Sequence, residues 1–345
     1  MALIHGGNLG LASREFGIPV DEWIDLSTGI SPWCWPVPAV PETVWQRLPE
    51  EDDGLLASAA DYYGCSPDSL LTVPGSQYAI RQLPALLPVA TVALPLWGYR
   101  EHHHAWQLAG HSAVIYRDIH HLQQLASDGA VTHALVINPN NPTTVLIDKP
   151  LLENLAGLLT GRGGLLVVDE AFMDPHPQQS LIPQRPAGVV VLRSVGKFFG
   201  LAGVRLGFVV ADPALIQLLG SGMNPWSVSH PARWVGSRAL ADRAWQQQQR
   251  QRLDRHSRQW LAAVEGLLPD LPWRGAAHFI SAEMDWERGQ QLYRAAAQRG
   301  LLLRLMGPNA RRGLLRLGLP TAAQQQRALG SLQSISDDTL GKPRA

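Results

Sequence analysis

The sequence predicts an α/β protein, with a mostly parallel central sheet between layers of helices and a smaller α+β domain towards the C-terminus. Two observations predict this architecture. From about Asp53 onward, short apolar runs alternate with helical patterns, which is typical of parallel strands joined by crossover helices. The chain also has 345 residues, more than one compact unit usually holds, so a large domain and a smaller one are expected.

The predicted elements follow from these patterns in chain order. Residues 1–45 are rich in Gly and Pro and are predicted to form an N-terminal arm that joins the small domain and the active site, because SPWCWPVPAVP suits neither a long helix nor a central strand. In the large domain, residues 46–225, helices are predicted at 54–64, 76–87, 98–109, 118–127, 148–161 and 213–220. Its predicted strands are 70–73, 90–94, 112–116, 131–137, 164–168, 189–193 and 206–211.

The predicted small domain comprises residues 226–335. A long helical stretch covers 231–268, followed by a strand at 277–283, a helix at 287–299, strands at 301–305 and 313–317, and a last helix from Thr321. Residues 336–345 are polar and are predicted to form a flexible tail.

Composition excludes several classes of protein. Lys plus Arg and Asp plus Glu number 29 each, so nothing favours nucleic acid or an anionic membrane as a partner. Two cysteines are no disulfide framework. The N-terminus lacks the pattern of a signal peptide, and no run approaches the ~20 apolar residues of a membrane span. A cytoplasmic enzyme is the expectation.

Lys197 is the candidate catalytic lysine, in the string RSVGKFFGLAGVRLGF. Ser194 precedes it by three residues and Arg205 follows it by eight, and a hydroxyl with a forked guanidinium suits a phosphate dianion. Asp169 ends the apolar run in LLVVDEAF, which predicts a carboxylate at the C-terminal end of a buried strand, where ligands bind in open parallel sheets. Considered singly, the lysine also fits a solvated loop and the aspartate a turn or helix cap.

Three further features complete the set. Gly75-Ser76-Gln77 begins a predicted helix, whose exposed amides suit phosphate, although an ordinary cap by Ser76 explains it equally. Asn141, in NPNNPTT, offers an amide donor or simply forms a turn. Trp97, in PLWGY, offers a flat face for ring stacking or packs in the core.

Taken together, these residues fit pyridoxal 5′-phosphate (PLP). Its aldehyde needs an amine, and its ring withdraws electrons only if the pyridine nitrogen stays protonated, which a neighbouring carboxylate ensures. The phosphate loop, the aromatic residue, the asparagine, the aspartate, the lysine and the arginine occur in one order, each after a predicted strand. The sequence therefore predicts Lys197 and Asp169 as catalytic residues. The cofactor-binding set comprises Ser76, Gln77, Trp97, Asn141, Asp169, Ser194, Lys197 and Arg205.

From His5 to about Leu319 the chain resembles the class I/II aminotransferase-like proteins, which have the PLP-dependent fold-type I architecture, in the branch that contains histidinol-phosphate aminotransferases. The motifs HGGN (5–8), DLSTGISPWCWP (25–36) and RLPEEDDGL are similar to those of threonine-phosphate decarboxylases. This resemblance implies a homodimeric carboxy-lyase of cobalamin biosynthesis. The implied reaction converts L-threonine O-3-phosphate to (R)-1-aminopropan-2-yl phosphate and CO₂.

The resemblance also implies residue roles. Lys197 forms the Schiff base, Asp169 faces the pyridine nitrogen and Asn141 the phenolate oxygen. The residues that hold the cofactor phosphate are Ser76, Gln77, Ser194 and Arg205. Those that bind the substrate are Arg316 at its carboxylate, Arg304 and His5 at its phosphate, and Gly6 beside them. Without the resemblance, both arginines are equally surface strand residues.

Two positions depart from the family pattern. Leu48 replaces a tyrosine that in relatives reaches the partner subunit's cofactor phosphate, so that contact is absent here. Phe172 replaces a tyrosine near the phenolate oxygen, and decarboxylase-like relatives often carry Phe there, which favours decarboxylation.

Two alternatives remain. Histidinol-phosphate aminotransferase activity would use the same cofactor residues with 2-oxoglutarate. A PLP-fold binding protein without turnover would typically lack the lysine or carry a DNA-binding segment. The run His102-His103-His104 is interpreted as a partly solvated helix face rather than a metal site, because consecutive helix residues point in different directions. His120-His121 is interpreted in the same way, and no metal is expected.

Overall fold

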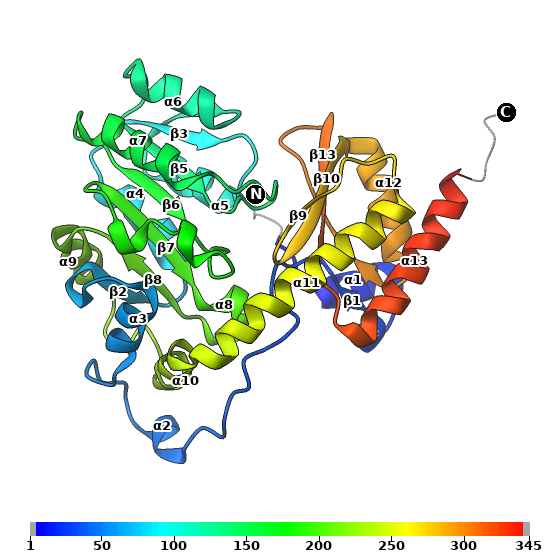
Figure 1. Cartoon of the computed structure of the whole chain (residues 1–345), viewed down its shortest axis with the longest axis horizontal. Helices are drawn as coiled ribbons and strands as arrows, with labels where there is room; N and C mark the ends of the chain where they lie inside the picture. The colour runs from blue at the N-terminus through cyan, green and yellow to red at the C-terminus, as the bar shows by residue number, and fades with distance from the viewer. Residues whose placement is uncertain (1–4, 341–345) are drawn as a thin grey trace. The chain divides into compact units, whose positions relative to one another are not determined.

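The computed structural model describes residues 5–340 (Figure 1). Its contacts divide the chain into two compact units. Unit 1 comprises residues 1–33, 142–144 and 250–345, and unit 2 comprises residues 34–141 and 145–249. These limits differ from the predicted boundaries at 45/46 and 225/226, because one division falls inside helix α11 (Arg243–Leu267) and another follows residue 33 within the predicted arm.

Unit 2 contains a seven-stranded sheet in the order β2-β8-β7-β6-β5-β3-β4. The strands are β2 (Leu70–Val73), β3 (Thr91–Pro95), β4 (Ser112–Tyr116), β5 (His133–Ile137), β6 (Leu166–Asp169), β7 (Val189–Ser194) and β8 (Gly207–Val210). Only β8 runs antiparallel to its neighbours, β2 and β7. The other pairs are parallel, which confirms the predicted fold class. Every residue of β5, β6 and β8 is buried, as expected for strands covered on both faces.

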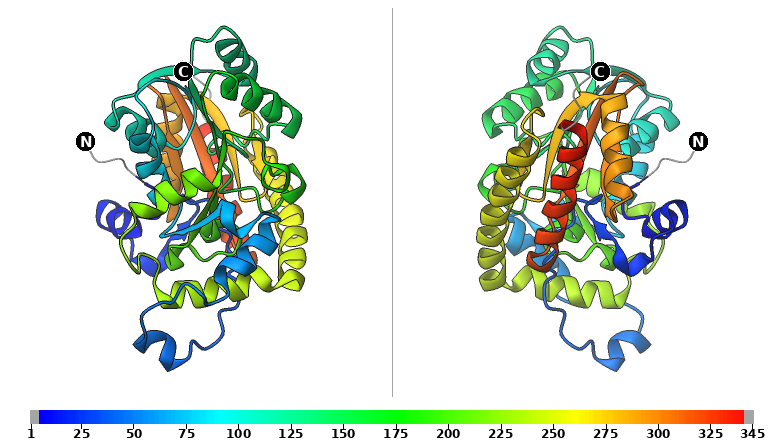
Figure 2. Two further views of the ribbon diagram at one scale, coloured as in Figure 1. Left: turned by 90° about the vertical axis from the view of Figure 1, so that its left-hand side faces the viewer. Right: turned by 90° about the vertical axis from the view of Figure 1, so that its right-hand side faces the viewer.

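The helices of unit 2 cover both faces of this sheet (Figure 1, Figure 2). Six of them, α3 to α7 and α9, match predicted helices closely, whereas α2 and α8 were not predicted. They are α2 (Glu42–Gln46), α3 (Leu55–Tyr63), α4 (Gln77–Leu86), α5 (Arg100–Leu108), α6 (Ile119–Ser127), α7 (Lys149–Thr160), α8 (Val195–Phe198), α9 (Pro213–Ser221) and α10 (His230–Ala241). One apolar core cluster joins α4 and α5 to the sheet through Ile80, Leu83 and Trp106.

Unit 1 is built on a four-stranded antiparallel sheet in the order β12-β13-β10-β9. Its strands are β9 (Arg274–Ala276), β10 (Phe279–Asp285), β12 (Arg304–Met306) and β13 (Arg312–Gly318). The helices α12 (Trp286–Ala297) and α13 (Ala322–Leu340) belong to the same unit. Strand β9 was not predicted.

The N-terminal arm is more structured than the sequence predicts. Helix α1 (Leu9–Phe16) is capped by the side chain of Asn8 and ends at Gly17, whose φ is 70°. Strand β1 (Ile24–Asp25) then pairs in parallel with β11 (Leu301–Leu302). The predicted arm thus contributes ordered elements to the C-terminal unit.

Two predictions at the C-terminal end need correction. The predicted helix 231–268 is divided into α10 and α11 at Asp242, whose carboxylate accepts hydrogen bonds from Trp245 N and the indole of Trp35. The predicted flexible tail from residue 336 begins inside α13, where buried Ser336 donates to Leu267 O. Residues 341–345 of that tail lie outside the described residues. No helix between residues 5 and 340 combines the length and apolar character needed to cross a membrane.

Candidate active site

The predicted catalytic residues of unit 2 come together at the C-terminal edge of its parallel strands. Asp169 is the last residue of β6 and Ser194 the last of the neighbouring strand β7. Lys197 follows in α8, the short helix that begins directly after β7, and its Nζ lies 5.6 Å from the centroid of the buried Phe172 ring. The structure therefore brings the amine and the carboxylate to one edge of the sheet, where ligands bind in this architecture.

Asp169 is held in place by two donors. Nε2 of His102, on α5, lies 2.8 Å from its Oδ2, and Ala171 N donates to its Oδ1 at 3.0 Å. Both side chains are almost fully buried. Because a carboxylate only accepts hydrogen bonds, the imidazole donates from Nε2. The carboxylate is therefore oriented as well as charged, which suits a partner for a protonated pyridine nitrogen.

The interpretation of His102 as part of a solvated helix face is wrong, since the side chain is 1% exposed. His103 is half-buried and His104 exposed, so only one residue of the run faces the sheet. The signal was present in the sequence, because His102 precedes the buried residues Ala105 and Trp106 by three and four positions and so shares their helix face.

The predicted phosphate residues form a close cluster at the start of α4. Gly75 adopts a φ of +77°, and a Cβ added there would lie 2.7 Å from the guanidinium of Arg205. A Cβ on Gly207 would lie 2.6 Å from Ser76 N. Ser76 occupies the N-cap position, but its side chain makes no capping hydrogen bond. Helix-start amides, the Ser76 hydroxyl and a guanidinium within this small space suit a phosphate dianion.

Arg205 itself adopts the left-handed conformation, with φ 55° and ψ 49°. A non-glycine residue in this region costs of order 1–3 kcal/mol and persists only where its surroundings demand it. The conformation is consistent with a guanidinium that must reach back over Gly75.

Gln77 belongs to a polar network that includes a residue the sequence reasoning missed, Tyr99. The Tyr99 hydroxyl donates to Gln77 Oε1 at 3.2 Å, and Gln77 Nε2 donates to Glu101 at 2.9 Å. Arg81 pairs with the same Glu101 oxygen at 2.8 Å. Gln77 is therefore held by its neighbours through both ends of its amide.

Tyr99 is also an aromatic residue beside the Asp169 carboxylate. Its ring lies edge-on to His102, with centroids 6.2 Å apart. Burial, Glu101 and Asp169 raise the pKa of Tyr99 to about 12, so its phenol stays protonated at neutral pH. Trp97, predicted for ring stacking, is half-buried, and its carbonyl accepts from Asn140 at 3.1 Å. Its role remains a prediction.

The loop that carries Asn141 is fixed by Asn138. The Asn138 side chain accepts from Ile147 N at 2.8 Å and donates to Ile147 O at 3.1 Å. The loop therefore has a defined path after β5, and Asn141 is half-buried within it. Its predicted contact with the cofactor remains a prediction.

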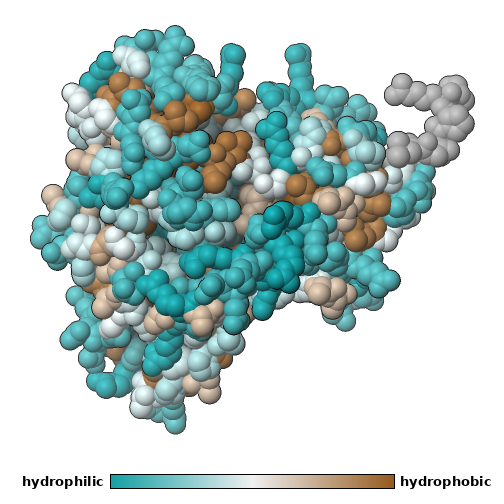
Figure 3. Space-filling model, in the orientation of Figure 1, coloured by the Kyte–Doolittle hydropathy of each residue, from teal (hydrophilic) through white to brown (hydrophobic). Residues whose placement is uncertain are grey.

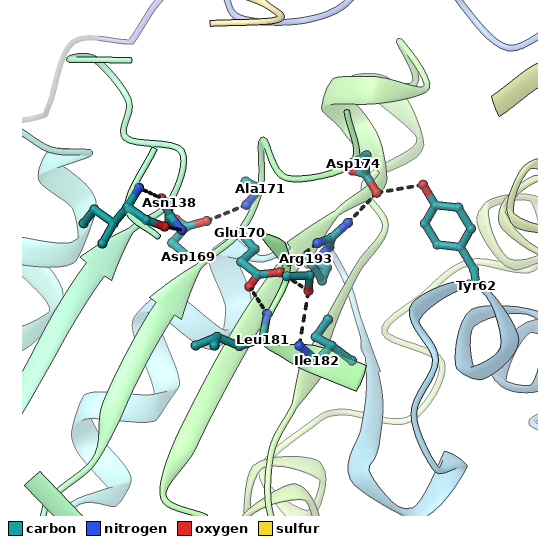
Figure 4. A network of polar contacts seen from close by, with 11 residues as sticks. Tyr62, Asn138, Asp169, Glu170, Ala171, Asp174, Leu181, Ile182 and Arg193 are labelled. Atoms are coloured by element: carbon teal, nitrogen blue, oxygen red, sulfur yellow. Dashed lines mark hydrogen bonds and ion pairs between the residues drawn. The ribbon is translucent and has the colours of Figure 1, made fainter. Parts of the chain in front are cut away.

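A buried ionic network underlies Asp169 and Ser194 (Figure 4). Arg193, the residue before Ser194, pairs with Glu170 at 2.8 Å and with Asp174 at 2.5 Å. Tyr62 donates to Asp174 at 2.9 Å. Burial raises the pKa of Glu170, while Arg193 opposes this shift. Glu170 directly follows Asp169, the last residue of β6, and Arg193 directly precedes Ser194, the last residue of β7. These contacts therefore fix the C-terminal ends of both strands, where the predicted catalytic residues lie.

The predicted substrate residues belong to unit 1. Arg316 on β13 is 7% exposed and pairs in register with Arg304 on β12. Burial and the charge of Arg304 lower the pKa of Arg316 to about 10, and Asp25 opposes this. A buried cation next to a second cation favours an anionic ligand. His5 and Gly6 are exposed at the beginning of the described chain.

Comparison with known proteins gives one family and several relatives. A family model described as aminotransferase class I and II matches residues 50–332. Threonine-phosphate decarboxylase of Pseudomonas aeruginosa is 44% identical over 92% of this chain and 93% of its own length. The protein of the same name from Salmonella typhimurium is 28% identical over 96% of both chains.

Solved structures show the same fold at low sequence identity. Histidinol-phosphate aminotransferase from Sinorhizobium meliloti, in complex with pyridoxal-5′-phosphate, is 19% identical, with a TM-score of 0.81 and coverage of 98% of this chain and 99% of the other. L-threonine-O-3-phosphate decarboxylase from Porphyromonas gingivalis is 17% identical, with a TM-score of 0.75 and coverage of 92% and 99%.

Proposed function

This chain belongs to the aminotransferase class I and II family, and we propose that it is a PLP-dependent carboxy-lyase of cobalamin biosynthesis. The proposed reaction converts L-threonine O-3-phosphate to (R)-1-aminopropan-2-yl phosphate and CO₂. The observation that carries this proposal is the 44% identity to a threonine-phosphate decarboxylase over almost the whole of both chains. The paired arginines of unit 1 support it, because the substrate has two anionic groups.

The residues of unit 2 fit the proposed cofactor. Lys197 would bind its aldehyde, and Asp169, oriented by His102, would face the pyridine nitrogen. Arg205 and the start of α4 would hold the phosphate. When bound, PLP supplies an electron sink for the pair left at Cα as CO₂ departs.

The chain's own residues would then perform three tasks. Arg316 would bind the substrate carboxylate, while Arg304 and His5 would bind the phosphate, so that these residues hold both anionic groups of the substrate. The buried carboxylate of Asp169 stabilises positive charge on the ring. The amine of Lys197 supplies the proton that replaces the carboxylate at Cα, so that one proton is consumed for each CO₂ released.

The direct test is to incubate the purified protein with PLP and L-threonine O-3-phosphate, without any oxo acid. We expect CO₂ and aminopropan-2-yl phosphate in equal amounts, and neither product from Lys197→Ala. Amino transfer from histidinol phosphate to 2-oxoglutarate, without CO₂ from threonine phosphate, would establish an aminotransferase instead. Absence of both reactions would leave a binding protein.

We infer that the protein acts as a homodimer. The strongly exposed large apolar side chains of unit 2 include Trp45 at 66%, Leu48 at 61% and Trp226 at 61%. The first two lie on and directly after α2, which packs against α10, and Trp226 precedes α10. Figure 3 shows apolar residues among hydrophilic ones at its lower end, where Figure 1 places α2. Exposed clusters of this kind typically mark protein interfaces.

We also propose a cytoplasmic location, because the cysteines of this chain are free thiols. Neither Cys34 nor Cys65 forms a disulfide, and both are free thiols. Thiols of this kind are typical of a reducing compartment.

A further inference from the structure

Ser27, in the segment directly after β1, connects two parts of unit 1 that are far apart in sequence. Its hydroxyl accepts a hydrogen bond from Gly7 N at 2.7 Å and donates to Asp25 Oδ1 at 2.6 Å. Its carbonyl accepts from Arg316 Nη2 at 2.5 Å. The side chain is 1% exposed, so these bonds are shielded from water. One residue therefore contacts both the N-terminal glycines and the buried arginine.

The glycine pair is packed directly on Ser27. A Cβ added to Gly6 would lie 3.0 Å from Ser27 Oγ and only 2.4 Å from Ser27 O, which is closer than a side-chain carbon approaches a backbone oxygen. Gly7 has a φ of +83°, a conformation that favours glycine. The path of residues 6 and 7 is thus set by the surface that Ser27 presents.

Ser27 is itself anchored by Asp25. The Asp25 carboxylate also accepts from Ser27 N at 2.8 Å, and Asp25 pairs with Leu302 in the β1–β11 ladder. A hydroxyl that both donates and accepts has its position fixed from two sides. Movement of Ser27 would therefore disturb Gly7 and Arg316 together.

We propose that Ser27 is a positioning residue that couples the Gly6–Gly7 segment to Arg316 and so makes the protein select amino acids that carry a phosphate. This inference rests on the proposed function, in which Arg316 binds the carboxylate and the His5–Gly6 segment lies at the phosphate. A ligand with both groups bridges two elements held in a fixed relation by Ser27. A ligand without the phosphate uses only one of them and gains nothing from the coupling.

The test compares two ligands, L-threonine O-3-phosphate and L-threonine. Their binding is measured by calorimetry in PLP-loaded Lys197→Ala protein, in which the reaction is blocked. Adding Ser27→Ala removes the acceptor of Gly7 N and one of the two hydrogen bonds that Ser27 donates to Asp25, so we expect affinity for the phosphorylated ligand to fall roughly tenfold or more. Affinity for L-threonine should change by less than about twofold, since the Ser27 carbonyl that holds Arg316 remains. In protein with Lys197 intact, KM should rise while kcat is largely retained.

A second measurement needs no ligand. Hydrogen exchange of the Gly7 amide should become faster in Ser27→Ala, because its acceptor is removed. Gly6→Ala disturbs the same contact through the glycine, because its new methyl group would clash with Ser27. We expect the same selective loss of affinity for the phosphorylated ligand. Ser257→Ala is the matched control, since it removes a buried hydroxyl of unit 1 that donates to Asp254 O within α11. It should alter neither the ligand ratio nor the exchange of Gly7.

An unchanged ratio of the two affinities in Ser27→Ala, or equal losses for both ligands, would overturn the proposal. Unchanged exchange at Gly7 would overturn it as well. Failure of the proposed function has a different signature. There, the protein with Ser27 intact would bind threonine phosphate no more tightly than threonine, while Gly7 exchange would still respond to Ser27→Ala.

Discussion

At the scale of single residues, the pair His102–Asp169 shows which site residue a sequence pattern could predict and which one was recognised only in the structure. Asp169 was predictable because it directly follows an apolar strand, and the C-terminal ends of such strands carry ligands. His102 was not recognised because its two histidine neighbours suggested a polar surface. Only helical periodicity places it on the buried face with Trp106.

His102→Ala should weaken PLP binding. The substitution leaves the buried Asp169 carboxylate without a hydrogen bond made at 2.8 Å, a loss of about 1–3 kcal/mol. We expect the PLP dissociation constant to rise about tenfold or more, measured by titrating apo-protein and following cofactor absorbance. His104→Ala, an exposed position on the same helix, is the control and should bind PLP normally. Equal affinities for both variants would contradict the role given to His102.

Arg193→Met should destabilise the fold strongly. It leaves the buried carboxylates of Glu170 and Asp174 unpaired, and breaking a buried ion pair by removing one partner costs about 3–5 kcal/mol. Urea unfolding would measure this loss. Arg258→Met is the comparison, because its pair with Asp254 is exposed on α11 and contributes about 0.3–0.5 kcal/mol. Similar losses in the two variants would refute the argument from burial.

At the scale of elements, the parallel strands and their helices were predictable because each has a local signal. Strands 70–73 and 112–116 coincide with the structure, and apolar runs between helical patterns specify them. The pairing that places β8 antiparallel between β2 and β7 has no such local signal. The break at Asp242 also escaped prediction, because its cap contact to Trp35 joins residues far apart in the chain.

Gly207→Ala tests how β8 supports the start of α4. The new Cβ would lie 2.6 Å from Ser76 N and 2.8 Å from Arg193 O, so the phosphate loop must shift. Overpacking of this kind costs about 1–3 kcal/mol, and we expect PLP affinity to fall about tenfold or more. Gly203→Ala introduces the same methyl group where nothing lies within 4 Å. It should retain normal PLP affinity, and a loss equal to that of Gly207→Ala would argue against a specific clash.

The free energy of unfolding should depend on pH because of His133, a buried residue of strand β5. Its Nδ1 accepts from Leu165 N, and burial, together with His111, lowers its pKa from 6.5 to about 4. The unfolded chain therefore binds a proton more readily than the folded one between these values. Stability is highest above about pH 6.5 and is lost as the pH falls towards 4.

The check is urea unfolding at several pH values in this window. His133→Gln should show a shallower decline than the parent protein. The decline will not vanish, because the pKa of His103 is lowered in the same way, to about 4. His120→Gln, an exposed position on α6, should follow the parent curve. A His133→Gln curve parallel to the parent would show that this histidine does not carry the effect.

At the scale of the whole molecule, the sequence predicted two units and an N-terminal arm that joins the smaller one, but not the contacts that make this connection. The N-terminal residues belong to the C-terminal unit because β1 pairs with β11, and Gly318 N donates to Leu26 O. These contacts join the two ends of the chain, and nothing in a short window of sequence encodes them. For the same reason Ser27 carried no signal as a site residue, although the motif around it supported the family resemblance.

The proposed homodimer is tested at this scale by charging the exposed apolar cluster at α2. The double variant Trp45→Glu, Leu48→Glu places two carboxylates where more than half of each apolar side chain is exposed. If this surface is buried between subunits, unpaired charges there are costly, and the variant should sediment as a monomer at concentrations where the parent is a dimer. Leu108→Glu, at a side chain 73% exposed at the end of α5, controls for added surface charge and should remain dimeric. A variant that stays dimeric would place the interface elsewhere, and a parent that sediments as a monomer would reject the homodimer altogether.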